Sequence, residues 1–168
     1  MSDLNQRNKN TAIAFWNALD KAPDTPADIQ SFLSADLRWN GFAPFADTST
    51  TADYLSSYVT PVYGAFDQVH RETHILMGGV SDGRADGGRD GRHWVGGTGY
   101  LNVNQVCNIY VIPTRNMPVR LRWGEFLQFD QDGKITCIQT IIDVIDWLEQ
   151  IDLSPLPRPK GAAHVYPA

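Results

Sequence analysis

The sequence predicts an α+β domain, with three N-terminal helices packed on an antiparallel β-sheet. Apolar residues recur at helical spacing three times within roughly the first 66 residues. Four strand-like segments follow, separated by turn residues. Helices followed by a run of strands are typical of the α+β class. The 168 residues fit one such domain, expected over 1–152, followed by a Pro-rich tail over 153–168.

Composition and charge exclude several classes of function. The net charge is -5 and the 14 Lys and Arg residues are scattered, so the basic patch of a nucleic-acid-binding protein is missing. The N-terminus is polar, and no stretch approaches the roughly 18 apolar residues of a membrane span, so we expect a cytoplasmic protein without membrane contact. Cys107 and Cys137 lack CxxC spacing, which favours core thiols over a zinc site or a disulfide.

The first two helices are predicted from an apolar stripe and a cap. One helix runs from about Asn5 to about Lys21, with a stripe made of Ala12, Phe15, Trp16 and Leu19. Thr25, Pro26 and Asp28 resemble a capping box that begins a second, short helix. Its apolar residues are Ile29, Phe32 and Leu33. A short strand, "LRWNG", is expected next.

The third helix begins at a second capping-box signature, Thr50 to Asp53. One face carries Leu55, Tyr58, Val59, Val62 and Phe66. Pro61 is expected to kink or split it. The strands then read "RETHILMGGV", "HWVGGTGYLNV", "VRLRWGEFLQF" and "KITCIQTIID".

We predict no metal site. The connection "SDGRADGGRDGR" between the first two of these strands lacks the ligand order of a calcium loop. His70 and His74 have a metal-ligand spacing only if they lie on a helix, yet they straddle the expected start of a strand.

The last hairpin allows two registers around Asp132 and Gly133. A two-residue type I′ loop places Asp143 opposite Arg122, whereas a three-residue loop with Gly133 in the left-handed region places Asp143 opposite Leu121. The first strand has an apolar face made of Val119, Leu121, Trp123, Glu125, Leu127 and Phe129. Only the three-residue loop aligns it with Ile135, Cys137, Gln139, Ile141 and Asp143. We therefore predict the three-residue loop.

In this register Glu125, Gln139 and Asp143 are the strongly polar residues on an otherwise apolar face, so we expect them to line a ligand pocket. Glu125 would pair with Gln139, with Asp143 roughly 13 Å away. This separation is too large for a glycosidase-like pair of carboxylates. Asp143 would then act alone, as a general acid or base, or would cap a short terminal helix. A structural hydrogen bond across the sheet is the alternative for Glu125.

Further pocket residues are predicted from their chemistry. Trp16, Trp39 and Trp123 are expected in the core, at the border of a cavity. His93 is interpreted either as a pocket base or as a solvated residue beside the loop. The opposite face of the hairpin carries Phe126, Ile138 and Ile142, which predicts a homodimer that packs sheet against sheet.

Several segments together resemble the SnoaL-like polyketide cyclase family of the nuclear transport factor 2-like superfamily. They are "RWNG", "YVTPVYGAF", "IPT", "WGEF", "DGKI" and "DVIDWLEQIDLSP". The resemblance implies a cone of helices on a curved sheet that encloses an apolar pocket. It also implies aldol ring closure of a polyketide without metal or organic cofactor, and the position of the family's acid/base aspartate matches Asp143.

Three functional hypotheses follow. The first is an Asp143-dependent cyclase, lyase or isomerase that acts on a small hydrophobic carbonyl compound. The second is a module that binds a small hydrophobic ligand without catalysis, and the third is a dimerisation module with a filled core.

Overall fold

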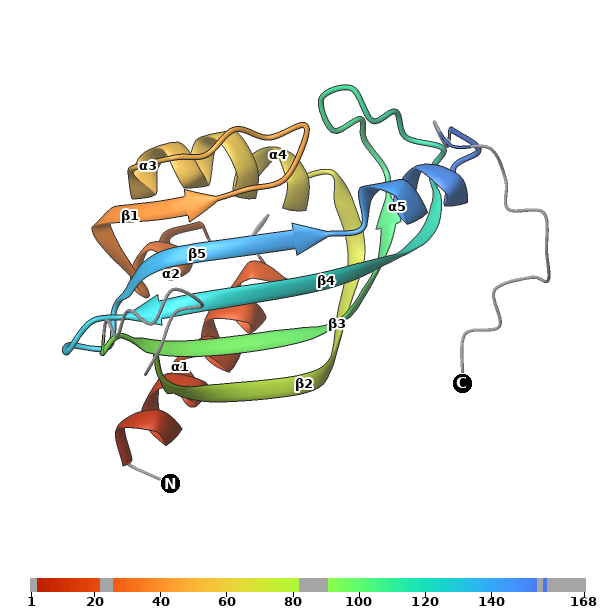
Figure 1. The fold of residues 1–168 in the computed structure, drawn as a ribbon. Coiled ribbons are helices and arrows are strands. Elements are labelled where there is room, and N and C mark those ends of the chain that lie inside the picture. Colours follow the sequence, from red (N-terminus) through yellow and green to blue (C-terminus); the bar gives the residue numbers. More distant parts are fainter. Residues whose placement is uncertain (1–2, 22–25, 82–90, 154–155, 157–168) are drawn as a thin grey trace.

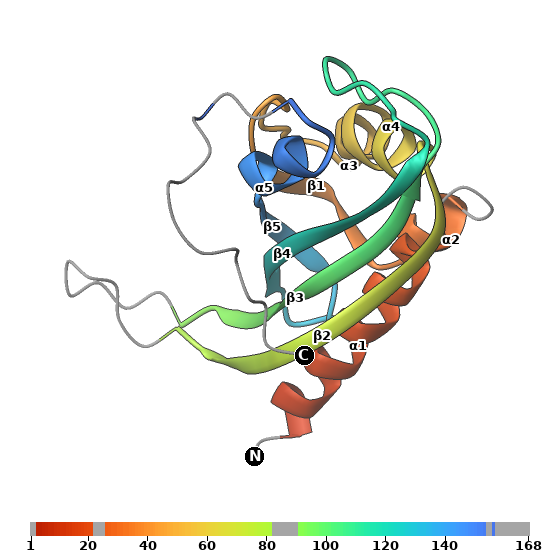
Figure 2. The ribbon, with the colours of Figure 1, turned by 90° about the vertical axis from the view of Figure 1, so that its right-hand side faces the viewer.

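The computed structural model describes residues 3–21, 26–81, 91–153 and 156. A curved five-stranded sheet carries α1 and the α3–α4 segment on the same side, which confirms the α+β prediction (Figures 1 and 2). The helices are α1 (Asp3–Leu19), α2 (Pro26–Gln30), α3 (Thr51–Tyr54), η1 (Leu55–Val59), α4 (Thr60–Tyr63) and α5 (Val144–Gln150). The strands are β1 (Leu33–Asn40), β2 (Phe66–Val80), β3 (His93–Gln105), β4 (Met117–Phe129) and β5 (Ile135–Ile142). The predicted cap at Thr25, most of the Gly/Asp-rich connection and most of the Pro-rich tail lie outside the described residues.

The strand order is β1-β5-β4-β3-β2. Strands β2 to β5 pair antiparallel, but β1 pairs with β5 in parallel, so the prediction of a wholly antiparallel sheet was wrong at this edge. Strand β1 begins at Leu33, which had been assigned to the second helix. Phe66 begins β2 instead of ending the third helix, because that helix stops at Tyr63 with Gly64 as its C-cap.

The helices bury the predicted apolar stripes against the sheet. In α1 the buried side chains include Ala12, Phe15, Trp16 and Leu19. Thr50 caps α3 by accepting a hydrogen bond from the backbone N–H of Asp53 at 3.1 Å, as the capping signature predicted. The third helix is interrupted by the π-helical turn η1, and Pro61 lies in the first turn of α4, where proline is tolerated.

The loop of the last hairpin has the predicted three residues. The N–H of Asp130 donates to the carbonyl of Lys134 at 3.0 Å, and Gly133 has a φ of +85°, the left-handed conformation that favours glycine. The register beyond the loop was predicted wrongly, because the ladder shifts between the pairs Phe129↔Ile135 and Gln128↔Cys137. Thr136 is the extra residue of this β-bulge, and it exchanges the two faces of β5.

The bulge changes which residues face the helices. Glu125 pairs with Thr140 instead of Gln139, and Phe126 pairs with Gln139. Gln139 is exposed, whereas Ile138, which had been assigned to the outer face, is fully buried. Ile142 likewise packs against the core, contrary to its predicted outward position.

Strand β5 is followed by α5, whose N-cap is Asp143. The Trp147 indole N–H donates to Oε1 of the buried Gln105 at 3.1 Å, which fixes α5 to the end of β3. Of the two cysteines, Cys137 is buried as predicted, but Cys107 is exposed. Among the described helices, none is long and apolar enough to cross a membrane.

Candidate active site

A small cavity lies between the sheet and the helices. Its lining includes Tyr58, Tyr63, Arg71, Trp123, Glu125 and Thr140. The free volume is about 20 Å³. This volume holds one water molecule, and a ligand of several heavy atoms fits only if lining side chains move. The enclosed apolar ligand pocket expected from the sequence is therefore nearly filled by side chains in this structure.

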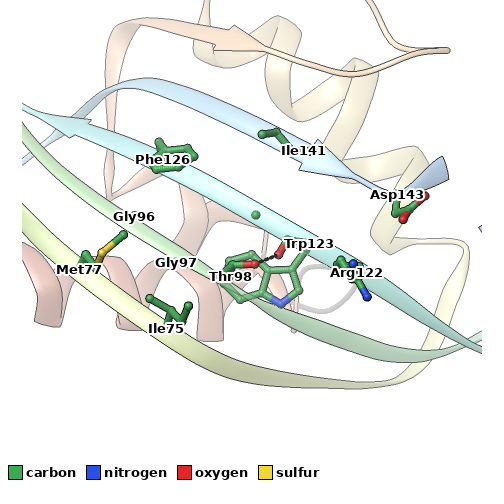
Figure 3. Close-up of a pocket in the computed structure, with 11 residues that line it drawn as sticks. Ile75, Met77, Gly96, Gly97, Thr98, Arg122, Trp123, Phe126, Ile141 and Asp143 are labelled. Carbon is green, nitrogen blue, oxygen red and sulfur yellow. Dashed lines mark hydrogen bonds between the residues drawn. The ribbon is translucent and has the colours of Figure 1, made fainter. Parts of the chain in front are cut away.

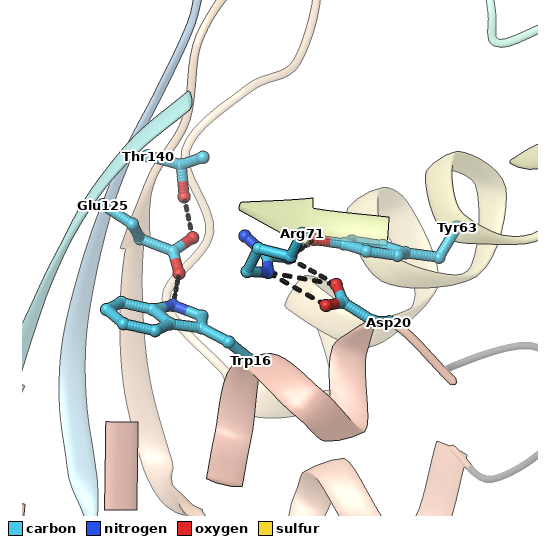
Figure 4. Close-up of polar contacts among 6 residues, drawn as sticks. All are labelled: Trp16, Asp20, Tyr63, Arg71, Glu125 and Thr140. Carbon is cyan, nitrogen blue, oxygen red and sulfur yellow. Dashed lines mark hydrogen bonds and ion pairs between the residues drawn. The ribbon is translucent and has the colours of Figure 1, made fainter. Parts of the chain in front are cut away.

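Glu125 is 4% exposed and is the one acid in the buried core of the described residues. The Trp16 indole N–H donates to its Oε2 at 2.6 Å, and the Thr140 hydroxyl donates to its Oε1 at 2.8 Å. The Trp39 indole N–H in turn donates to the Thr140 oxygen at 2.8 Å. Two of the predicted pocket tryptophans therefore converge on Glu125, one directly and one through Thr140. Figure 4 shows Trp16 and Thr140 on either side of the carboxylate.

The environment of Glu125 favours its protonated form. Burial raises the pKa of the Glu125 carboxyl, and the nearby Arg71 charge together with the Thr140 and Trp16 hydrogen bonds only partly opposes that rise. A raised pKa brings a carboxyl closer to the working range of a general acid or base.

Arg71 supplies a second buried charge to the same cavity. Its Nε is 3.1 Å from both oxygens of Asp20, and its Nη2 is 2.7 Å from Oδ1 of Asp20. Nη2 also donates to the Tyr63 hydroxyl at 3.1 Å, and the guanidinium lies over the Trp123 ring, 4.6 Å from its centre. In Figure 4 the guanidinium lies between the carboxylates of Asp20 and Glu125. Burial raises the pKa of Tyr63 to about 12, so this hydroxyl stays neutral.

Strand β2 contains two bulges, and the first of them turns Arg71 toward the cavity. The β2–β3 register shifts between Asp67 and His70 and again between Thr73 and Ile75. The first shift adds one residue after the buried Phe66, and Arg71 faces inward for that reason. Sequence reasoning missed both Arg71 and Asp20. The available signal was weak: Asp20 directly follows a helix without a basic residue in its last turn, where a carboxylate is unfavourable.

Trp123, also predicted to line the pocket, is 3% exposed and packs edge-on against Trp16 at 5.1 Å. Its indole N–H is buried and has no hydrogen-bond partner among the described residues. A buried donor without a partner is uncommon in proteins. Since Trp123 lines the cavity, an acceptor that enters the cavity is one candidate partner for this N–H.

The structure places the other predicted site residues elsewhere. Asp143 had been expected on the inner face but lies on the outer one, where its Oδ1 accepts a hydrogen bond from the N–H of Asp146 at 3.0 Å. The capping alternative therefore describes its geometry, and a catalytic role for Asp143 stays a prediction. Gln139 lies on the same outer face as Phe126, its partner in the ladder. His93 is opposite Phe129, four residues along β4 from Glu125, which is roughly 13 Å.

The histidines that were considered as metal ligands also lie apart from the cavity. His70 pairs with Asn102 in the β2–β3 ladder, and His74 contacts Glu72 at 3.3 Å. Among the described residues, no group of three or more His, Cys, Asp and Glu side chains is placed to hold a metal ion.

The outer face of the sheet has a larger, apolar hollow of about 470 Å³ (Figure 3). Ile75, Met77, Phe126 and Ile141 surround it, and Arg122 and Asp143 lie toward one end. The Phe126 ring packs over Gly96, and Gly124 contributes no side chain to the face. The hollow and the Glu125 cavity lie on opposite faces of the sheet.

The sequence was compared with known proteins, and neither a family model nor a curated protein matches it. Solved structures do match its fold. A proposed SnoaL-like polyketide cyclase from Jannaschia sp. CCS1 has 12% identity and a TM-score of 0.69, covering 94% of this chain and 98% of that chain. IdmH, a proposed polyketide cyclase from Streptomyces antibioticus, has 12% identity and a TM-score of 0.66, over 86% and 98%.

AclR, a proposed hydroxylase from Streptomyces galilaeus, is similar at 17% identity with a TM-score of 0.59, over 86% of this chain and 83% of that chain. Identities this low establish the fold and leave the chemistry open. The chain has the same fold as these SnoaL-like and NTF2-like proteins, which is the fold that its sequence motifs predicted.

Proposed function

We propose that this protein is an enzyme of the SnoaL-like fold that performs cofactor-independent general acid/base chemistry on a small hydrophobic carbonyl compound, with Glu125 as the acid/base. The observation that carries the proposal is a carboxyl with a raised pKa in the core, at the wall of a cavity that also contains a guanidinium. Similar solved structures include proposed cyclases and a proposed hydroxylase, which supports an enzymatic role.

The cavity residues fit the parts of such a reaction. In its ionised form Glu125 removes a proton from the carbon next to a carbonyl group, and in its protonated form it returns that proton to carbon or oxygen. The electron pair released from the C–H bond moves onto the carbonyl oxygen. Arg71 and the free indole N–H of Trp123 are the groups that stabilise the negative oxygen. An aldol closure or an isomerisation both pass through this enolate.

The experiment compares Glu125→Gln with Asp143→Asn. Each protein is incubated in D₂O with a panel of small aromatic 1,3-diketones, and NMR follows loss of the proton between the carbonyl groups. We expect exchange above the background rate for the wild type and for Asp143→Asn, and at least a hundredfold less for Glu125→Gln. Glutamine keeps the shape of the side chain and one acceptor oxygen. Equal exchange by Glu125→Gln and the wild type would exclude Glu125, and loss in Asp143→Asn alone would return the role to Asp143.

A second candidate function is homodimerisation through the outer face, because the inner cavity is almost filled and this face is apolar. Ile141 is 60% exposed and Met77 is 59% exposed. Phe126 is 40% exposed and its ring packs over Gly96, while Gly124 leaves a low area on the same face, so this face offers a second copy an apolar surface to pack against. The predicted dimer therefore stays a proposal. On β5 its contact residue is Ile141, because Ile138 and Ile142 face the core instead of the outer face.

Sedimentation velocity tests the dimer. We expect a dimer for the wild type and a monomer for Phe126→Glu, with an unchanged far-UV spectrum, since a carboxylate at the centre of an apolar contact is costly. Ala35→Glu, at an exposed position of β1, is the matched control, because it adds the same negative charge. A monomeric wild type would exclude the dimer and leave the hollow as a ligand site.

A further inference from the structure

The Glu125 cavity is separated from solvent by one layer of side chains where α1 lies beside β2. A groove of about 440 Å³ runs between these elements, and its lining includes Trp16, Asp20 and Arg71. Arg71 also lines the inner cavity, and Trp16 donates its hydrogen bond to Glu125. The groove and the cavity therefore share the Arg71 side chain as a wall.

Two other walls of the cavity are harder to open. Toward the outer hollow the wall is the sheet itself, where β3 and β4 pair without a register shift from His93↔Phe129 to Gln105↔Met117. Toward the loop after β1 the wall is a cluster of rings, in which Phe45 contacts Trp39, Phe42 and Tyr58. Opening the first would break backbone hydrogen bonds, and opening the second would expose large aromatic surfaces.

The Asp20–Arg71 ion pair is a different kind of wall. A buried ion pair contributes little net stability, because desolvation of both charges offsets their attraction. The charge of Arg71 still needs an anion, but that anion need not be Asp20. If Asp20 moves away, Tyr63 and the Trp123 ring still hold the guanidinium in place. Asp20 directly follows the last residue of α1, and its side chain is the more exposed of the pair, at 15% against 8%.

We propose, building on the proposed function, that the α1–β2 groove is the route by which substrate reaches Glu125 and that the Asp20–Arg71 pair closes this route. The substrate then carries a carboxylate or enolate oxygen that takes the place of Asp20 on Arg71. A guanidinium binds such oxygens through two parallel hydrogen bonds, the geometry that Asp20 now occupies. The unpartnered Trp123 indole N–H, next to Arg71, is a further donor for the same group.

Acetate is the probe for this exchange of anions. The chain has five tryptophans, and their indole N–H signals in ¹H–¹⁵N spectra can be assigned with Trp16→Phe and Trp123→Phe. Acetate is titrated at constant ionic strength, and the Trp123 signal gives the affinity. We expect Asp20→Asn and Asp20→Ala to bind acetate at least tenfold more tightly than the wild type, because Arg71 has lost its anion. Asp36→Ala, which removes an exposed carboxylate outside the groove, should match the wild type.

Solvent exchange of the Trp123 indole proton tests the route itself. We expect exchange at least tenfold faster in Asp20→Ala than in the wild type, and little change in Phe45→Ala, which loosens the aromatic wall. Equal acetate affinities in the wild type and both Asp20 variants would overturn the proposal, as would exchange accelerated by Phe45→Ala and not by Asp20→Ala. Neither measurement requires turnover. If Glu125→Gln keeps its activity while both measurements come out as expected, the proposed role of Glu125 is excluded and the proposed route is retained.

Discussion

Replacing Thr140 by valine tests whether the hydrogen bonds around Glu125 are a connected network. The side chains have nearly the same shape, but valine lacks the hydroxyl that joins the Trp39 indole N–H to Oε1 of Glu125. Two buried polar groups lose a partner, and each such loss costs about 1–3 kcal/mol. A water in the cavity can replace one of the bonds, so we expect Thr140→Val to lower the free energy of unfolding by about 2–4 kcal/mol.

Urea unfolding followed by tryptophan fluorescence measures this loss, with an unchanged m-value as the sign that the unfolded state is unaffected. Thr140→Ser is the control, because it keeps the hydroxyl and loses one methyl group, which costs roughly 1 kcal/mol. The loss in Thr140→Val should grow as the pH rises through the raised pKa of Glu125, since a bond to an ionised carboxylate is the stronger one. A serine variant as unstable as the valine variant would refute the role of the hydroxyl.

Three further predictions concern stability. Because the fold raises the pKa of Glu125, the folded state binds that proton more tightly than the unfolded chain does. Wild-type stability should therefore fall as pH rises from about 4.5 through the raised pKa. Urea titrations at each pH should show a smaller fall for Glu125→Gln. Asp143→Ala should cost about 1 kcal/mol through loss of the α5 cap while Asp143→Asn costs little, and equal costs in thermal melts would contradict the cap. Gly99→Ala should destabilise severely or prevent folding, because its Cβ would lie 1.9 Å from the Glu72 carbonyl oxygen in the β2–β3 ladder; a melting temperature close to that of the wild type would contradict this.

Local patterns predicted most of the fold because each depends on a few neighbouring residues. The stripe of α1 and the apolar face of β4 are both buried as their periods of about 3.6 and 2 indicate. The turn at Gly133 followed from the Asp-Gly pair and the face pattern, and the cap at Thr50 from its spacing to Asp53. These signals are short-range, so the sequence carries them directly.

The candidate site was predicted only in part because bulges decide it. One inserted residue, Thr136, exchanged the faces of β5 and replaced Gln139 by Thr140 as the partner of Glu125. The first bulge of β2, between Asp67 and His70, did the same for Arg71. No residue type marks a bulge reliably, and a strand with apolar residues in both phases, such as "KITCIQTIID", fits either register. Glu125 was found since β4 is regular throughout.

Glu125 and the Asp20–Arg71 pair act as one unit, and this connects access to chemistry. The Arg71 charge is the strongest of the effects that lower the pKa of Glu125, whereas the negative charge of Asp20 adds to its rise. A substrate that carries its negative oxygen past the pair first separates Asp20 from Arg71. The substrate oxygen then lies on Arg71 in place of Asp20, so the guanidinium keeps an anionic partner while Glu125, in its ionised form, removes the proton. Once the enolate forms, Arg71 stabilises its negative oxygen and Glu125 carries the proton. In this arrangement the ion pair that closes the route also sets the protonation state of the acid behind it.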